Sequence, residues 1–457
     1  MHISRFAVAL FFIFVTGRAH AQLTLEQAVE QAMTKYPAVR ASLQQVSAAA
    51  AGINLARTSY LPRADFMGQV NRATHNNLFG MMLTPSIISP ISGPVLQTNS
   101  LDSVWGSAVG LLVSWEPFDF GLRRANVGVA QSTREVAHAQ VAVTRLQAGA
   151  AAADAFLTIA AAEQAAMAAR AGVERARVLD QSVEVLAKNE LRPGADASRT
   201  RAELALAQTQ LIQAEQAVEV GRAALGQVLG VAPQTIAIDA GVLLKAPPES
   251  PGAAAEVARH PLAVAQNAAI EEVKAREKAI DRSYFPRFSL EGTAYARGTG
   301  IDPSGAAGGG ANGLGPNFQN WGVGVNVTFP AFDLPSIRAR KEVEHYHELA
   351  EAAKYDQVLQ NLTGELEKAK ATLAGARRVA ANTPVQLEAA RATEQQATAR
   401  YKAGLANIVE AAEAQRILTQ AEIDDALAQL SIWRALLAVA AAEGDLEPYL
   451  EQVRRAR

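Results

Sequence analysis

The sequence predicts a mainly α-helical chain that also carries four membrane-crossing β-strands. A set of sequence marks recurs in the two halves of the chain, so one structural unit is expected twice. Each half contains segments in which apolar residues alternate with small or polar ones, a period typical of strands. Each half also contains a run of about 65 to 70 residues, 121–190 and 335–401, without a helix stop other than Pro384. Each unit is therefore expected to contain a helix, two strands joined by a loop, a very long helix, a turn and a returning helix.

Four marks recur in the same order in the two halves. They are Tyr36-Pro37 and His260-Pro261, Tyr60-Leu61-Pro62-Arg63 and Tyr284-Phe285-Pro286-Arg287, Trp115-Glu116-Pro117-Phe118-Asp119 and Phe329-Pro330-Ala331-Phe332-Asp333, and Gly194 and Gly404. The spacing is 224 residues for the first two pairs, 214 for the third and 210 for the last. The falling spacing indicates loops of different length, and chance is a poor explanation for four ordered matches.

The helix that opens each half is marked by a proline. Thr24 with Gln27 three residues later forms a capping-box pattern, so the first helix is expected to start there, with a break at Pro37. Its counterpart is expected over about 252–283, interrupted at Pro261.

The clearest strand pattern lies in the second half. Its apolar residues Trp321, Val323, Val325, Val327 and Phe329 alternate with Gly322, Gly324, Asn326 and Thr328. Similar alternation occurs over 65–71, 108–115 and 288–295. Tilted strands of about 10 residues cross a bilayer with lipid on one face and water on the other. We therefore expect the three valines to face lipid, and Asn326 and Thr328 to face the lumen.

The two long runs predict rods, each on the order of 100 Å at 1.5 Å per residue. The helices that return after the turn glycines carry small or apolar residues at alternating spacings of three and four, which is typical of coiled-coil seams. The first seam is Leu204, Ala207, Leu211, Ala214, Val218, Gly221, Leu225 and Val228, and the second is Ala411, Ala414, Leu418, Ala421, Asp425, Ala428, Ile432, Ala435 and Val439. These seams are expected to pack the rods side by side.

Composition restricts the compartment and excludes several functions. Residues 1–21 have the pattern of a secretory signal, with Arg5 before an apolar run and Ala19-His20-Ala21 as the cleavage site. The formal net charge of −2 indicates neither a nucleic-acid surface nor an acidic tail. The chain has no cysteine, which excludes disulfides, thiolate metal sites and a lipidated N-terminal cysteine. No later apolar run approaches the roughly 20 residues of a membrane-spanning helix, so a membrane anchor is expected from the fold.

Three of these recurring marks carry a resemblance to a known family. They are the Tyr-Leu-Pro and Tyr-Phe-Pro junctions at 60–62 and 284–286, the Phe-Asp pairs at 118–119 and 332–333, and the turns Leu191-Arg192-Pro193-Gly194 and Tyr401-Lys402-Ala403-Gly404. In this order, and behind a signal, they make the chain resemble the outer-membrane efflux protein family, the TolC-like outer membrane factors. The resemblance covers nearly all of the mature chain.

The resemblance implies a homotrimer, because four strands per chain are too few to close a barrel. Three chains would supply a 12-stranded β-barrel, continued by a 12-helix α-barrel of long coiled-coil hairpins and surrounded by an irregular equatorial collar. The implied location is the outer membrane of a Gram-negative bacterium, in contact with its lipid and extending into the periplasm. The implied function is the exit duct of a tripartite efflux or type I secretion system, gated at its periplasmic tip. A periplasmic adaptor would join the duct to an inner-membrane pump, and the pump would choose the cargo.

The repeat sets the expected division of the chain. Residues 1–21 form the signal peptide, 22–230 the first repeat, 231–252 an equatorial linker, 253–443 the second repeat and 444–457 a C-terminal equatorial tail. The irregular stretches 75–103 and 297–320 are expected outside the cell, since exposed loops do not cross lipid.

The hairpin turns are the first candidate site. Gly194 and Gly404 are expected as C-cap glycines that let a helix reverse. By resemblance, the tips that contain Arg192, Gly194, Tyr401 and Gly404 would also dock the adaptor.

The second candidate site follows Gly404. Glu410 and Glu413 share one helix face, which by itself indicates only a solvated surface. The resemblance implies that they form the channel constriction, where a trimer would present rings of carboxylates that attract cations. A charge latch at this tip is not expected, because Ala406 and Thr200 stand where a basic and an acidic partner would be needed.

Other constellations have plainer explanations. His345 and His347 point to different sides of a helix, so a shared metal is not expected. Met81-Met82 is interpreted as a loop contact, and the glycines at 322 and 324 as a small strand face. Asp119 and Asp333 are expected to cap the long helices. No enzyme, cofactor or metal site is predicted.

An alternative is a periplasmic coiled-coil adaptor or structural rod that never enters the membrane. It would share the signal and the coiled-coil seams, but it would not need four amphipathic strands. Heat-modifiable migration and fractionation into the outer membrane distinguish the two.

Overall fold

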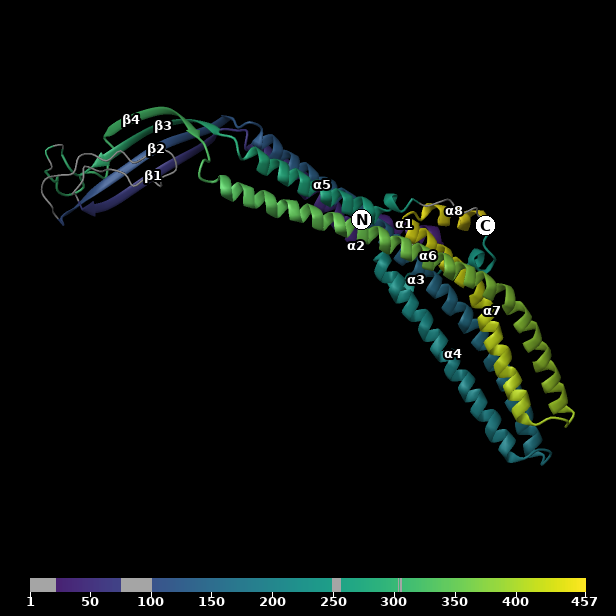
Figure 1. The fold of residues 1–457 in the computed structure, drawn as a ribbon. Coiled ribbons are helices and arrows are strands. Elements are labelled where there is room, and N and C mark those ends of the chain that lie inside the picture. The colour runs from purple at the N-terminus through teal and green to yellow at the C-terminus, as the bar shows by residue number, and fades with distance from the viewer. Residues whose placement is uncertain (1–21, 75–100, 249–255, 303, 305) are drawn as a thin grey trace, which may run out of the picture. The chain divides into compact units, whose positions relative to one another are not determined.

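The computed structural model describes residues 22–74, 101–248, 256–302, 304 and 306–457 (Figure 1). The expected signal at 1–21, Met81-Met82 with the rest of 75–100, and 249–255 lie outside the described residues. The chain divides into two compact parts. One, the hairpin part, comprises Met1–Gln44, Ala139–Ala265 and Asp356–Arg457, and the other, the sheet part, comprises Gln45–His138 and Gln266–Tyr355.

The sheet part contains four antiparallel strands in the order β1-β2-β3-β4 (Figure 1). They are β1 (Arg63–Thr74), β2 (Ser103–Phe118), β3 (Arg287–Thr299) and β4 (Phe318–Thr328). The four predicted strands are confirmed, and each extends beyond the residues in which the alternation was found. Parts of both expected loops therefore belong to strands, and Phe329 follows β4 instead of ending it.

The register gathers the apolar residues of all four strands on one face. Phe66 pairs with Leu111, Leu111 with Ala294 and Ala294 with Trp321. Trp321, Val323 and Val325 are 81%, 71% and 67% exposed in the single chain, so no segment among the described residues covers this apolar face on β4.

The opposite face carries small and polar residues. Gly322 pairs with Thr293, and Gly110 with Tyr295. A Cβ atom at Gly110 would lie 2.5 Å from the Tyr295 Cβ, so only glycine lets the two strands carry this tyrosine here. The predicted small strand face at Gly322 is consistent with this arrangement.

Helices α1 (Leu25–Lys35) and α2 (Pro37–Thr58) confirm the capping box and the break at Pro37. The Thr24 N–H donates to the Gln27 side chain at 3.1 Å, and the Gln27 N–H donates to the Thr24 hydroxyl at 3.3 Å. The two reciprocal bonds satisfy N–H groups that a helix start otherwise leaves free.

In the second half the expectation of a helix from about residue 252 is wrong for 256–260. A short 3-10 turn, η3 (Val257–Arg259), precedes helix α5 (Pro261–Arg282). The residue before a proline avoids the helical conformation, and His260 instead caps α5, its Nδ1 accepting a hydrogen bond from the Leu262 N–H at 3.1 Å.

Four long helices follow the strands, as predicted. They are α3 (Leu122–Lys188), α4 (Gly194–Leu229), α6 (Leu334–Lys402) and α7 (Ile408–Glu443). The predicted seams of α4 and α7 are their buried or half-buried residues. Asp425, the one charged residue of the second seam, accepts a hydrogen bond from the buried Thr383 hydroxyl at 3.0 Å. Pro384 lies inside α6 without ending it.

The core of the hairpin part joins both helical hairpins to the N- and C-terminal segments. Its largest buried side chains include Leu25, Phe156, Ile159, Leu225, Trp433 and Tyr449. The expected linker contributes the 3-10 turns η1 (Pro233–Thr235) and η2 (Gly241–Leu244), and the Trp433 indole N–H donates to the Lys245 carbonyl at 3.0 Å. The C-terminal tail, expected as part of an irregular collar, instead forms helix α8 (Glu447–Arg455).

Within the described residues, α7 is the one helix long and apolar enough to span a membrane by composition. Its apolar residues Leu418, Ala428, Trp433 and Leu437 are buried in the hairpin part. Packing against neighbouring helices therefore accounts for its composition.

The junction between β2 and α3 is held by a buried ion pair. The Asp119 carboxylate accepts hydrogen bonds from the N–H groups of Gly121 at 3.1 Å and Arg123 at 2.7 Å, and from the Arg123 Nε at 2.9 Å. The two charged side chains are 9% and 8% exposed. Arg123 also donates to the Ser59 carbonyl at 3.1 Å and lies 5.0 Å from the centre of the Tyr60 ring. The predicted cap at Asp119 is confirmed.

Burial by itself raises the pKa of Asp119. The hydrogen bonds from Arg123 and Gly121, together with the guanidinium charge, outweigh that effect and hold the pKa below its usual value. The carboxylate is thus ionised over the physiological range.

The junction between β4 and α6 is built differently. Asp333 precedes α6 directly, and its carbonyl accepts a hydrogen bond from the Ile337 N–H at 2.9 Å. Among the described residues, no N–H group of α6 donates to the Asp333 carboxylate, so a side-chain cap is found at Asp119 but not here. Ile337 occupies the place of Arg123, four residues after the aspartate, and is buried.

Candidate functional site

The turn between α3 and α4 departs from the sequence prediction. Gly194 is the first residue of α4, and its φ is not positive, so the expectation of a C-cap glycine there is wrong. The left-handed residue is Glu190, with φ of +58°, and the Leu191 N–H donates to the Leu186 carbonyl at 2.9 Å. Glu190 therefore closes α3 in the position that usually holds glycine.

The turn between α6 and α7 follows the prediction. Gly404 has φ of +76°, and its N–H donates to the Tyr401 carbonyl at 3.0 Å. Leu405 N–H reaches the Arg400 carbonyl at 2.8 Å, which completes the C-cap of α6. Asn407 then caps α7, accepting a hydrogen bond from the Glu410 N–H at 3.0 Å.

Arg192 and Tyr401 join the two turns. The Arg192 Nη2 donates to the Tyr401 carbonyl at 2.9 Å, and the guanidinium carbon lies 4.7 Å from the centre of the Tyr401 ring. This distance is typical of a cation–π contact. The structure thus brings together two of the predicted tip residues through a direct bond.

Tyr401 is 2% exposed and packs with Leu179, Val183, Ile408 and Ala411. Burial raises the pKa of its phenol, the negative charge of Asp196 acts in the same direction, and Arg192 opposes them. The ring therefore remains neutral and fixes the backbone carbonyl that Arg192 binds.

Glu410 and Glu413, the predicted constriction residues, lie exposed on the first turns of α7. Glu413 accepts a hydrogen bond from Arg416 Nε at 2.9 Å, and this bond and the cation lower the pKa of Glu413. Among the described residues, no side chain binds the Glu410 carboxylate. Arg416 was not among the predicted site residues, although a basic residue three positions after Glu413 on a helix is the sequence signal for such a pair.

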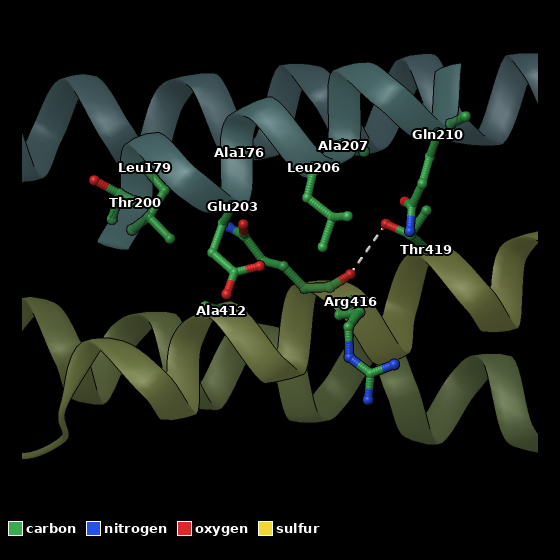
Figure 2. Close-up of a pocket in the computed structure, with 13 residues that line it drawn as sticks. Ala176, Leu179, Thr200, Glu203, Leu206, Ala207, Gln210, Ala412, Arg416 and Thr419 are labelled. Atoms are coloured by element: carbon green, nitrogen blue, oxygen red, sulfur yellow. Dashed lines mark hydrogen bonds between the residues drawn. The ribbon is translucent and has the colours of Figure 1, made fainter. Parts of the chain in front are cut away.

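A shallow groove of about 50 Å³ lies between α3, α4 and α7 near the tip. Figure 2 shows Glu203 and Leu206 projecting from α4 towards α7, which carries Arg416 and Thr419. Ligand sites usually measure about 300 Å³ or more. The groove is therefore a seam between helices and too small for a transported molecule.

Thr200 also lines this groove and is buried. Its hydroxyl donates to the Asp180 carboxylate at 2.7 Å. Thr200 is therefore engaged within its own hairpin.

Arg175 joins the hairpins at a second point. Its Nη2 lies 2.8 Å from a carboxylate oxygen of Glu422 and 2.8 Å from the Thr419 hydroxyl, and its Nη1 lies 3.3 Å from the second oxygen of Glu422. Both side chains of the ion pair are about one-fifth exposed. Sequence reasoning missed this pair because its members are 247 residues apart, and helical spacing relates only residues on one helix.

The described residues contain no cluster of three or more histidine, cysteine or acidic side chains that would hold a metal ion. His345 and His347 are both exposed on α6.

Three solved outer-membrane channels share this arrangement of strands and long helices. OprN matches with a TM-score of 0.70 and 22% identity over 92% of this chain and 89% of that one. CmeC of Campylobacter jejuni gives 0.71 and 16% over 94% and 89%, and VceC of Vibrio cholerae gives 0.69 and 16% over 92% and 96%. The fold is that of an outer-membrane channel, in which barrel strands continue into a helical barrel.

The family follows from the sequence itself. The model of the family described as "Outer membrane efflux protein" matches residues 28–231 and 255–445, and the chain belongs to this family. It is a protein of the outer membrane of Gram-negative bacteria that extends into the periplasm. Among curated proteins, no sequence matches the chain significantly.

Proposed function

We propose that three copies of this chain form the exit duct of a tripartite efflux or type I secretion system. The observation that carries the proposal is an open four-stranded sheet with an exposed apolar face. Four strands cannot close a barrel, because closure needs about eight or more. Three copies joined from β4 of one chain to β1 of the next supply twelve strands and leave no free edge.

The first experiment separates this duct from a periplasmic adaptor or rod. The protein is expressed in a Gram-negative host, the envelope is fractionated, and the outer-membrane fraction is run on a gel with and without heating. A duct migrates as a trimer until it is heated. A protein that remains soluble in the periplasm would sink the proposal.

The hairpin turns are proposed as the docking surface for the periplasmic adaptor. Leu191 and Leu405 are exposed apolar residues beside the turns that contain Arg192, Gly194, Tyr401 and Gly404. Exposed apolar side chains at the ends of paired helices suit the apolar face of a partner helix. The adaptor would connect the duct to an inner-membrane pump.

The absence of cysteine from the sequence allows a specific test of docking. Leu405→Cys provides a single thiol at the tip, and Leu55→Cys provides an equally exposed thiol on α2. A thiol-directed cross-linker in intact cells should join the adaptor to Leu405→Cys and not to Leu55→Cys. Equal yields from both positions would argue against docking at the tip.

Two of the contacts between the hairpins, those made by Arg192 and Arg175, are proposed to hold the tip closed. Arg192 binds the backbone of Tyr401 at the end of α6, and Arg175 binds Glu422 on α7. Movement of the α6–α7 hairpin away from the α3–α4 hairpin must therefore break a hydrogen bond and a half-buried ion pair. Opening would therefore require adaptor contacts that replace them. This arrangement does not need the charged latch that Ala406 and Thr200 cannot supply.

Glu410 and Glu413 are proposed to line the narrow entrance. In a trimer their carboxylates would form two rings. Arg416, which forms an ion pair with Glu413 of the same chain, would partly neutralise the ring of Glu413. The trimer should be cation-selective in planar bilayers. Glu410→Gln combined with Glu413→Gln should weaken that selectivity and the block by trivalent cations, whereas Glu388→Gln, an exposed acid on α6, should not. Unchanged selectivity in the double variant would place the constriction elsewhere.

A further inference from the structure

The sheet part contains an apolar groove that the channel function does not use. The groove measures about 360 Å³ and lies beside the ends of β2 and β4 and the start of β3. It is lined by Pro117, Phe118, Phe120, Phe288, Ser289, Leu290 and Val325. We call it the bulge groove.

A β-bulge explains why the groove exists. Trp115 pairs with Leu290 and Phe118 pairs with Phe288, so β2 advances three residues while β3 advances two. An extra residue bends a strand away from its partner, and Pro117 within the bulge has no N–H to restore the pairing. The two strands separate there, and the gap is walled by side chains.

Aromatic rings form one wall of the groove. Phe120 has φ of +49°, a left-handed conformation that is strained for a bulky residue. Its ring stacks on Phe285 with centroids 5.3 Å apart and meets Phe118 edge to face at 4.6 Å. These ring contacts stabilise the strained backbone of Phe120 and keep its ring at the wall of the groove.

The bulge groove opens on the apolar face of the sheet. Phe288, Leu290 and Val325 lie on the same face as Val323 by strand register. The groove centres on β2 and β3, the two inner strands, so closure of a barrel through the edges of β1 and β4 would leave it uncovered. It is therefore continuous with the surface that faces lipid in a barrel.

A cation stands beside the groove. The Arg282 guanidinium lies 6.0 Å from the centre of the Phe285 ring, which itself stacks on Phe120. Arg282 is exposed, and within the described residues no carboxylate lies in ion-pair range of it. A guanidinium without an ion-pair partner, beside an apolar surface, suits the phosphate of a phospholipid whose acyl chains contact that surface.

We propose that the bulge groove binds one acyl chain of an anionic glycerophospholipid and that Arg282 binds its phosphate. The proposal rests on the proposed duct, because the groove meets lipid only when the sheet is part of a barrel in the membrane. Each trimer would hold three such lipids, one per chain. They would lie in the periplasmic leaflet, where the strands pass into the helices.

Native mass spectrometry of the trimer, extracted from outer membranes in a mild detergent, tests the groove. Val325→Trp fills the groove, whereas Val323→Trp places the same side chain on the same face outside it. The unaltered protein and Val323→Trp should retain phospholipid, and Val325→Trp should lose it. Equal retention by the two variants overturns the proposal.

The phosphate contact is tested by adding back lipid to delipidated trimer. Dioleoyl-phosphatidylglycerol should bind in preference to dioleoyl-phosphatidylethanolamine, and Arg282→Gln should lose that preference while Arg338→Gln, an exposed arginine on α6, keeps it. An unchanged preference in Arg282→Gln overturns the role of this residue. Failure to form a heat-modifiable trimer would refute the duct itself, whereas a stable trimer that retains no phospholipid refutes only this inference.

Discussion

The two halves of the chain share their sequence marks but fasten the strands to the helices in opposite ways. In the first half, the Asp119–Arg123 pair is buried and satisfied by backbone groups. In the second half, the buried Ile337 takes the place of the arginine and the Asp333 side chain does not cap α6. The comparison shows that both halves contain a junction between a strand and a long helix, but that different contacts hold the two junctions.

The largest expected effect breaks the polar junction. Asp119→Ala leaves the buried Arg123 without its carboxylate and should destabilise the protein by about 3 to 5 kcal/mol. Asp119→Leu combined with Arg123→Ile copies the apolar solution of the second half and should recover most of that loss. Thermal unfolding of the trimer measures both. A double variant as unstable as Asp119→Ala would show that the two junctions are not interchangeable.

The pH dependence of this junction has a defined sign. The pKa of Asp119 is lowered in the folded protein, so its contribution is present above the usual carboxyl pKa and is lost as the pH falls through the lowered value. The stability difference between the unaltered protein and Asp119→Ala should therefore be constant near neutral pH and shrink below about pH 4. A difference that does not change with acidification would exclude an ionised Asp119 as its source.

The next effect compares the two faces of the sheet. An arginine on the lipid face costs up to about 2 to 4 kcal/mol, with the cost largest at the bilayer midplane and smaller towards the interfaces, whereas one in the lumen is tolerated. Val325→Arg in β4 and Leu111→Arg in β2 should both reduce the yield of assembled trimer much more than Asn326→Arg. Equal yields for Val325→Arg and Asn326→Arg would reverse or remove the assignment of the faces.

A smaller effect compares the residues at corresponding places before the turn glycines. Arg192 bonds to the other hairpin, whereas Lys402, two residues before Gly404, is exposed on its own turn. Arg192→Ala should remove about 1.5 kcal/mol from the closed tip and raise the conductance of the trimer in bilayers, while Lys402→Ala should leave it unchanged. If both variants conduct like the unaltered protein, the Arg192 contact does not restrain the tip.

The smallest effect compares the two turns themselves. Glu190 adopts the left-handed conformation that Gly404 adopts without strain. Glu190→Gly should therefore stabilise the fold by about 1 kcal/mol, and Gly404→Ala should destabilise it by a similar amount. Chemical denaturation of the two variants measures the signs. Destabilisation by Glu190→Gly would mean that the glutamate side chain, and not only its backbone, serves the turn.

Local sequence patterns predicted the elements of the fold well. Thr24 and Gln27 marked a helix start because a capping box uses only neighbouring residues, and the valines of β4 marked a strand because side chains alternate between its faces. The prediction that Gly194 ends α3 was wrong because Gly194, which follows Pro193, is the first residue of α4. The residue that ends α3 in the left-handed conformation is Glu190, for which that conformation is strained. A glycine in a turn sequence therefore does not identify which residue adopts the left-handed conformation.

The candidate site was predicted less completely, because its contacts are formed between distant parts of the chain. Arg192 and Tyr401 were each placed at a turn, but nothing in their spacing indicated that one would bind the carbonyl of the other. Arg175 lies on α3 and Glu422 lies on α7. Because a helical spacing pattern relates only residues of one helix, no local pattern indicated that these two side chains would pair. Packing of the hairpins decides these pairs.

The open edges of the sheet determine how the protein can reach its membrane. Among the described residues, no strand pairs with the outer edge of β1 or of β4, so each edge carries a row of unpaired backbone N–H and carbonyl groups. Hydrocarbon offers these groups no hydrogen bond, so a lone subunit is excluded from the bilayer, while in water the same edges favour aggregation. In the proposed trimer, insertion and subunit association would then be one concentration-dependent event. A subunit with a defective β1 edge would block the neighbours it joins, and a minority of such subunits would silence a larger share of the pores.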